Sequence, residues 1–343
     1  HIEAHSFPTR RSSDLHIPLS LALYDQRGGY LGDQCDRVVD IIQKQQSVVF
    51  TGINEKPVLA LLQDFSAPVK LEFSYSDHDL LILMQHSKSE FSRWDAAQTL
   101  INKYIRQNVE SVQQGKEMTL PSALLEVLAA ILVDQKLDKS LIAEILRIPS
   151  ETSMAELFDA IDIDAIHQVK HFIEKTIATQ LHDLFIDVYQ QSKTKHYDLN
   201  QKDIAKRDLV SVCLYYIGLN GNESDHLLIA NHFNNADNMT DVLAAMQAAK
   251  QGQLPVLDKM MNTFEAKWSH DGLVMDNWFR LQASSPAEGC LNTVKSLLKH
   301  PSFSMHNPNR LRALIGTFTA ANPYRFHAPD GSGYQFLGDV LNE

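Results

Sequence analysis

The sequence predicts a mainly α-helical fold, a superhelix of HEAT- or armadillo-like stacked helix pairs, preceded by the end of a β-sandwich domain. Two observations carry this prediction. Residues 16–71 hold β-branched and aromatic runs bounded by glycine or proline, as strands often are. From residue 72 to residue 343, short segments with apolar residues at three-and-four spacing follow one another through short turns. No exact sequence period is visible, so the repeat is expected to be structural only.

The composition and charge of the chain disfavour some classes of protein. The chain has 343 residues, of which 44% are hydrophobic, and a formal net charge of -11. A negative charge disfavours nucleic-acid binding, and no apolar run approaches the roughly 20 residues that a membrane-spanning helix needs. The three cysteines, Cys35, Cys213 and Cys290, lie far apart. We therefore expect buried free thiols and a cytoplasmic location, with neither nucleic acid nor membrane as a partner.

Residues 1–15, HIEAHSFPTRRSSDL, differ from everything that follows, because they show no hydrophobic periodicity. Residues 5–15 match one translated frame of a common sequencing-adapter DNA. We interpret residues 1–15 as a non-native, disordered leader; a disordered basic arm is the alternative. If the leader is foreign, the native protein begins upstream and this chain is a fragment.

Residues 16–71 are expected to form the C-terminal part of a β-sandwich domain. HIPLSLALYD alternates in part and precedes Gly28 and Gly29, SVVFTGI is a β-branched run closed by Gly52, and APVKLEF is a third candidate strand. Because the segment is short for an independent sandwich, a larger β domain is expected to contain it.

Helices are expected throughout residues 72–343. Ser76 can cap the first of them, because Asp79 stands at the third position after it. Asp138 can cap a later helix, and the pair Asn220-Gly221 is a natural terminator. Apolar residues on one face predict one long helix from about residue 164 to residue 191.

Two further helix starts stand close together near the end of the chain. Ser285 can cap a helix with Pro286 at its first position, and Glu288 completes a capping box. Asn307 can cap the next helix, with Pro308 at its first position. The two starts predict stacked helices in this stretch.

The exact order of residues in these segments is more specific than their hydrophobic periodicity. SPAEGCLNTVKSLLKHPSFSMHNPNRLRALIGTF, FSAPVKL, FSRWDAAQTL, NNADNMTDVLAAM and GLVMDNWF closely resemble the C-terminal region of the bacterial aminopeptidase N family of zinc metallopeptidases. The resemblance extends from about His16 to Gly338. It implies that residues 16–71 end the family's β-sandwich domain and that residues 72–343 are most of its helical C-terminal domain, truncated before its last helices.

The resemblance also implies a function for the parent protein. Members of this family are aminopeptidases that remove N-terminal residues from peptides with broad specificity, using a zinc ion held by two histidines and a glutamate. None of those residues lies in this chain, so we expect it to hold no catalytic residue and no metal. Its implied partners are peptide substrates and the missing catalytic domain. Its implied role is to cap and enclose the active-site chamber.

A search for metal chemistry in the chain itself gives one weak candidate. The pattern HExxH, which supplies two zinc ligands and a general base, is absent. The nearest match, His167-Gln168-Val169-Lys170-His171, places two histidines on one helix face, but Gln168 cannot act as a base. A metallohydrolase that uses this pair is one rival hypothesis, and a solvated helix face is the simpler interpretation.

Three residues are candidates for the wall of the substrate chamber. By resemblance, the segment with Asn309, Arg310 and Arg312 belongs to the inner wall, where a guanidinium could orient a carboxylate or carbonyl group through forked hydrogen bonds. The alternative is a cation on an exposed helix face. A rival hypothesis for the whole chain is a free-standing α-solenoid that binds a protein partner.

Overall fold

The computed structural model describes residues 3–5, 16–32, 35–194 and 196–342. The chain divides into two compact units. The first comprises residues up to Tyr104 together with Pro121–Leu137, and the second comprises Ile105–Leu120 and the chain from Asp138 onward. This division does not follow the change from strands to helices near residue 72. The predicted division into leader, sandwich part and helical domain stays a prediction.

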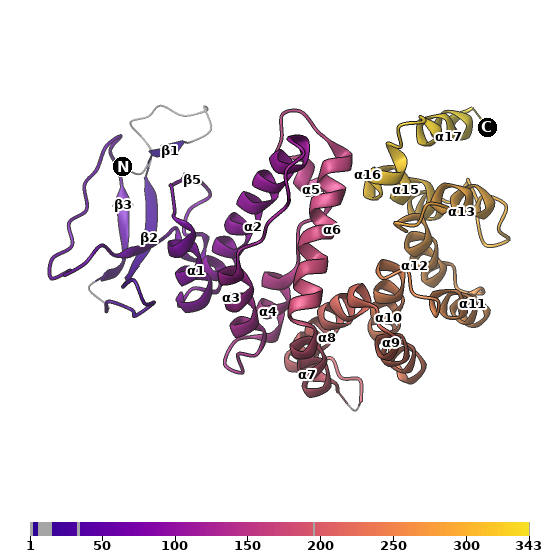
Figure 1. The fold of residues 1–343 in the computed structure, drawn as a ribbon, viewed down its shortest axis with the longest axis horizontal. Coiled ribbons are helices and arrows are strands. Elements are labelled where there is room, and N and C mark those ends of the chain that lie inside the picture. The colour runs from indigo at the N-terminus through magenta and orange to yellow at the C-terminus, as the bar shows by residue number, and fades with distance from the viewer. Residues whose placement is uncertain (1–2, 6–15, 33–34, 195, 343) are drawn as a thin grey trace. The chain divides into compact units, whose positions relative to one another are not determined.

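The first unit contains a three-stranded antiparallel sheet (Figure 1). β2 (Ile17–Tyr24) lies between β3 (Asp36–Ile41) and β4 (Val58–Leu61), with the register Leu19 opposite Val39 and Leu21 opposite Leu61. Alternate residues of β2 point into a core, whose buried members are Ile17, Leu19, Leu21, Leu61, Leu62 and Ala67. The first predicted strand is therefore confirmed.

The second predicted strand is wrong. Residues 47–53 form no strand, and the strands β3 and β4 lie on either side of this segment. Phe50 packs against the core, but Val49 is 75% exposed. A β-branched run becomes a strand only where a ladder partner and a buried face are available, and this segment has neither on its Val49 side.

A separate two-stranded ladder joins β1 (Glu3–His5) to β5 (Lys70–Glu72), with Ala4 opposite Leu71. β5 lies within the third predicted strand segment. Residues 1–2 and 6–15 lie outside the described residues, so the interpretation of the leader as foreign stays a prediction.

α1 (Asp77–His86) begins as the sequence predicts. The Ser76 hydroxyl accepts a hydrogen bond from the Asp79 amide, and the Asp79 carboxylate accepts one from the Ser76 amide, both at 3.1 Å. This reciprocal pair satisfies two amides that a helix start leaves without partners. α1 packs against α3 (Ser122–Leu132), and α2 (Glu90–Gln113) connects the two units along the chain.

The second unit is helical, and neighbouring helices along the chain pack on one another (Figure 1). Its helices are α4 (Lys139–Leu146), α5 (Glu151–Ala155), α6 (Ile163–Gln180), α7 (His182–Ser192), α8 (Gln201–Asn220), α9 (Glu223–Asn235), α10 (Met239–Gln251), α11 (Leu257–Trp268), α12 (Gly272–Ala283), α13 (Cys290–Leu297), α14 (Pro308–Leu311), α15 (Thr317–Ala321), α16 (Pro323–Phe326) and α17 (Ser332–Leu341).

α8 is the most embedded of these helices, and it packs against α4, α6, α7, α9 and α10. Its contact with α10 is close because Gly218 has no side chain: a Cβ there would lie 2.5 Å from the Ala248 carbonyl oxygen. α8 ends at Asn220, and Gly221 follows with a φ of 67°. That left-handed conformation favours glycine, which confirms the predicted terminator.

Two predicted helix boundaries in this unit are wrong. The long helix predicted for residues 164–191 breaks at Leu181 into α6 and α7, because Leu181 leaves the helical conformation with a φ of -110° and a ψ of 14°. The helix predicted to start after Ser285 starts only at Cys290. The carbonyls of Ser285 and Pro286 instead accept hydrogen bonds from Asn322 and Arg325, and these contacts hold the segment out of a helix.

The cysteines and the membrane prediction can also be checked. Cys35, Cys213 and Cys290 are free and buried, as predicted. Burial raises the pKa of the Cys290 thiol, which disfavours the thiolate that a nucleophile needs. Among the helices of the described residues, none combines the length and the apolar character needed to cross a bilayer.

Candidate functional site

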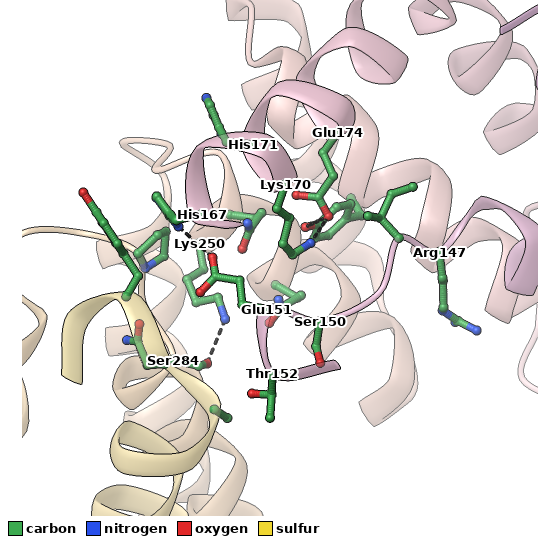
Figure 2. Close-up of a pocket in the computed structure, with 18 of the residues that line it drawn as sticks. Arg147, Ser150, Glu151, Thr152, His167, Lys170, His171, Glu174, Lys250 and Ser284 are labelled. Carbon is green, nitrogen blue, oxygen red and sulfur yellow. Dashed lines mark hydrogen bonds and ion pairs between the residues drawn. The ribbon is translucent and has the colours of Figure 1, made fainter. Parts of the chain in front are cut away.

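The second unit contains a cavity of about 750 Å3, which we call the α6 cavity (Figure 2). Its walls come from α5, α6, α8 and α10, from the end of α4, and from the segments around Ser284 and Tyr324. A volume of this size lies within the range typical of small-molecule sites, roughly 300 to 1,000 Å3. The cavity is therefore large enough to hold a small organic ligand.

α6 supplies one charged wall. His167, Lys170, His171 and Glu174 recur at three-and-four spacing and all line the cavity. The residues between them that point the other way are buried in the core: Ile166, Val169, Ile173 and Ile177. One helix therefore anchors its apolar face and presents a row of titratable groups to the cavity.

His167 is held by two neighbours. Its Nδ1 lies 2.6 Å from Oε1 of Glu151, and its ring stacks on Tyr324 with centroids 3.6 Å apart and planes 3° from parallel. His171 shares the helix face, as predicted, but it is exposed and points away from His167 (Figure 2). Partial loss of hydration and the nearby charge of His167 lower the pKa of His171.

The two histidines do not belong to a larger ligand set. Within the described parts of the chain, no group of three or more His, Cys, Asp or Glu side chains comes close enough to hold a metal ion. The residues present therefore do not fit a zinc centre. The weak metal candidate of the sequence gains no third ligand from the fold.

Lys170, Glu174 and Tyr215 form a polar cluster on the same wall. The Lys170 ammonium makes an ion pair with Glu174, and the Tyr215 hydroxyl donates to Oε1 of Glu174 at 2.9 Å. Glu174 is only 3% exposed. Because both neighbours are hydrogen-bond donors, the buried carboxylate has its charge compensated. Burial, followed by the charge and hydrogen bond of Glu174, raises the pKa of Tyr215.

Lys250 reaches the cavity from the last turn of α10. It is 4% exposed, and its Nζ donates to the Ser284 hydroxyl at 2.8 Å. Burial lowers its pKa from the usual 10.5 to about 8. Figure 2 shows Lys250 and Ser284 pointing toward one another across this side of the cavity.

The segment that follows α12 is fixed by two polar side chains of the α16 region. The Asn322 amide donates to the carbonyls of Ala283 and Ser285, at 3.0 and 2.9 Å. The Arg325 guanidinium donates from Nε to the Pro286 carbonyl at 2.7 Å. These bonds place Arg325 and Lys250 against neighbouring parts of one short segment.

The predicted chamber-wall residues lie elsewhere, in α14 and at the start of the π-helix η3 (Arg312–Gly316) that follows it. Asn309 and Arg312 are exposed, whereas Arg310 is buried. Arg310 makes an ion pair with Asp276, donates to the carbonyls of Ser302 and Gly272, and lies over the Phe279 ring. Its guanidinium therefore joins α14 to α12 and has its donors engaged within the protein, and its predicted place in the chamber wall stays a prediction. For Asn309 and Arg312 the prediction stays untested.

A second cavity, of about 730 Å3, lies near α7, α8 and α9. Tyr189 and His232 meet there, with the Tyr189 hydroxyl 3.1 Å from Nδ1 of His232. Nε2 of His232 lies 3.8 Å from Oδ1 of Asp241, and neither of these two buried atoms has a hydrogen-bond partner among the described residues. This arrangement is less developed than the α6 cavity.

Sequence reasoning missed Lys250, Glu174 and Arg325. One signal was available for Lys250. It follows AAMQAA, and the alanines of that run are buried. A lysine on the buried face of an alanine-rich helix is unusual, because lysine side chains are almost never fully buried unless they are paired. Glu174 also had a local signal, because Lys170 stands four residues before it on the same helix. Its second partner, Tyr215, and the Pro286 carbonyl that holds Arg325 come from distant parts of the chain, so no local pattern indicates those contacts.

Comparisons with known proteins give the chain relatives along nearly its whole length. Residues 77–343 match the family described as a domain of unknown function, DUF3458_C, with ARM repeats, and residues 3–74 match DUF3458, with an Ig-like fold. These descriptions agree with the predicted fold class of stacked helices after a β-sandwich part.

The relatives that match are aminopeptidases. Aminopeptidase N of Escherichia coli strain K12 is 46% identical over 334 residues, which are 96% of this chain and 38% of the relative. Aminopeptidase N of Haemophilus influenzae is 42% identical over 333 residues, with the same coverage. The crystal structure of Legionella pneumophila aminopeptidase A in complex with aspartic acid matches with a TM-score of 0.81 and 28% identity, over 97% of this chain and 39% of that one. The chain thus spans less than two-fifths of these relatives and corresponds to the C-terminal region of aminopeptidase N.

Proposed function

This chain belongs to the DUF3458_C family of ARM-repeat domains, and from that premise we propose that it is the non-catalytic C-terminal part of a zinc-dependent aminopeptidase. We call the full-length product of the native gene the parent protein. The observation that carries the proposal is the 46% identity to the C-terminal region of aminopeptidase N from Escherichia coli. The parent protein would remove N-terminal residues from peptides with broad specificity, in the cytoplasm.

In this proposal zinc belongs to the part of the parent protein outside this chain. The described side chains do not assemble a zinc centre, and the sequence holds no HExxH pattern. When bound, zinc would polarise a water molecule for attack on the peptide carbonyl. The residues of this chain would act by shaping the space around the substrate.

The role that we propose for this chain is to cap and enclose the active-site chamber. A closed site excludes bulk water and so strengthens electrostatic interactions with the substrate. The exposure of Asn309 in α14 and of Arg312 just after it supports this role, because both side chains are available to a peptide. The buried Arg310 would hold the same helix in place.

The native coding sequence tests the proposal. We expect the frame upstream of the His16 codon to continue into an HExxH pattern and a downstream glutamate. A start codon immediately before residue 1 would contradict the proposal. That result would favour the rival function, a free-standing α-solenoid that binds a protein partner, for which the ARM-repeat family match is the only support.

A further inference from the structure

Lys250 is a buried cation with an incomplete set of partners. Its Nζ carries three N–H donors, and one of them reaches the Ser284 hydroxyl. That hydroxyl donates its own hydrogen to the Arg280 carbonyl at 2.8 Å, so it acts as an acceptor toward Lys250. In the parts of the chain that the structure describes, Lys250 has no other hydrogen-bond partner and no carboxylate within 4.0 Å.

Three other charged groups of the α6 cavity have counterparts within the protein. Lys170 pairs with Glu174, Arg147 pairs with Glu144 and Asp208, and His167 contacts Glu151. Lys250 differs from these three groups, because its one hydrogen-bond partner among the described residues is a neutral hydroxyl. Burying a cation in this way is unfavourable unless an anion joins it.

A second cation without an acidic partner lies at the same end of the cavity. Arg325 donates to the Pro286 carbonyl and lies over the Tyr324 ring, 4.7 Å from its centroid, and no carboxylate of the described residues pairs with it. Ser284, which holds Lys250, and Pro286, which holds Arg325, are two residues apart. The short segment between them thus brings two uncompensated cations to one end of the cavity.

The walls around these cations favour an organic anion over an inorganic one. Tyr324, Tyr216, Pro286 and Pro323 line the cavity together with Lys250. Its volume of about 750 Å3 is far larger than a single small ion needs. An ammonium group and a forked guanidinium are the groups with which proteins bind carboxylates.

We propose that the Lys250 end of the α6 cavity binds the carboxylate of an amino acid or a short peptide. The Lys250 ammonium would supply the charge, and Arg325 would supply a second, half-exposed cation. The choice of amino acids and peptides rests on the proposed function, since they are the products and substrates of an aminopeptidase. The anion site itself rests only on the burial and the missing partner of Lys250.

Calorimetric titration of the parent protein tests this site. The probe is N-acetyl-alanyl-alanine, and its C-terminal amide is the matched uncharged ligand. Acetylation removes the free amino terminus that an aminopeptidase requires, so binding at the proposed catalytic centre is separated from binding at Lys250. We expect the acid to bind at least tenfold more tightly than the amide.

Two variants locate the binding. Lys250→Met keeps an unbranched side chain that is one atom shorter and removes its charge, and we expect it to weaken binding of the acid at least tenfold. Lys299→Met removes one positive charge at an exposed position of the same unit and is expected to leave binding unchanged. Thermal unfolding of both variants reports whether they fold. If Lys250→Met does not fold, the comparison of acid with amide in the unmodified protein remains decisive.

The outcomes are distinct. Titration with N-acetylalanine beside the dipeptide tells whether an amino acid or a peptide is the better source of the carboxylate, and tighter binding of either supports the site. Equal binding of acid and amide overturns the proposal, as does unchanged binding by Lys250→Met. Absence of alanyl-p-nitroanilide hydrolysis with intact acid binding would overturn the proposed function alone.

Discussion

Arg310 donates a hydrogen bond from Nε to Oδ1 of Asp276 at 2.8 Å, and the two side chains are only 6% and 5% exposed. The pair joins α12 to α14. Two backbone carbonyls, of Gly272 and Ser302, accept further hydrogen bonds from the same guanidinium. The short helix that carries Asn309 and precedes Arg312 is thereby fixed to α12, which connects this ion pair to the proposed chamber wall.

Removing one member of this pair is expected to destabilise the protein strongly. In Arg310→Met the Asp276 carboxylate stays buried without its partner, which typically costs about 3–5 kcal/mol of unfolding free energy. Urea unfolding of the parent protein measures the change. Arg312→Met, two residues away and exposed, is the control and should stay within about 0.5 kcal/mol. A loss below 1 kcal/mol for Arg310→Met would show that the pair does not hold α14.

The burial of Lys250 predicts that the free energy of unfolding depends on pH. Its pKa in the folded protein is about 8, against 10.5 for an exposed lysine. Between these values the unfolded chain binds more protons than the folded one, so unfolding free energy rises with pH. The penalty for burying the charge is therefore largest below pH 8, at about 3 kcal/mol, and disappears as pH approaches 10.5.

Comparison of the unmodified protein with Lys250→Met isolates this penalty, because the ionisation of other groups cancels. We expect the variant to be the more stable protein at pH 7, with a difference that shrinks between pH 8 and pH 10. Urea unfolding at unit intervals of pH provides the measurement. A difference that does not change with pH would contradict a buried, charged Lys250.

The contact between α8 and α10 predicts that Gly218 cannot carry a side chain. In Gly218→Ala the new Cβ would lie 2.5 Å from the Ala248 carbonyl oxygen, so the helices must separate. Overpacking of this kind typically costs about 1–3 kcal/mol. Gly338→Ala in α17 is the matched control, since its Cβ would meet nothing within 4 Å and alanine favours helix. The midpoint temperature of thermal unfolding should fall for Gly218→Ala and stay level or rise for Gly338→Ala.

The proposed place of Arg312 in the chamber wall predicts that its substitution lowers activity independently of stability. If its guanidinium faces the substrate chamber, Arg312→Ala removes a hydrogen bond to a charged or polar group of the peptide, worth about 1.5–3 kcal/mol. We expect kcat/KM for tripeptides to fall roughly 10- to 100-fold in the parent protein. Arg280→Ala, which removes another exposed arginine of the same unit, is the control. Equal kcat/KM for Arg312→Ala and the unmodified protein would remove Arg312 from the chamber wall.

Local signals predicted four of the helix ends correctly. The caps of Ser76, Asp138 and Asn307 accept the expected amide hydrogen bonds, and Gly221 ends α8. In each of these cases the residues that decide the conformation lie within a few positions of one another in the sequence. A single sequence contains all the information that such a feature needs.

Features decided by distant residues were missed. Ser285, Pro286 and Glu288 satisfy every local rule for a helix start, but hydrogen bonds from Asn322 and Arg325 hold the chain in another conformation. The same contacts build one end of the α6 cavity. Lys250 went unnoticed for a related reason, since its importance depends on the carboxylates that are missing around it.

Hydrolysis of alanyl-p-nitroanilide tests the central claim most directly. The purified chain of 343 residues and the parent protein are compared with and without added zinc. The account predicts zinc-dependent release of p-nitroaniline by the parent protein and none by the chain alone. Zinc-dependent release by the chain alone would contradict it, because a catalytic centre would then lie within these residues.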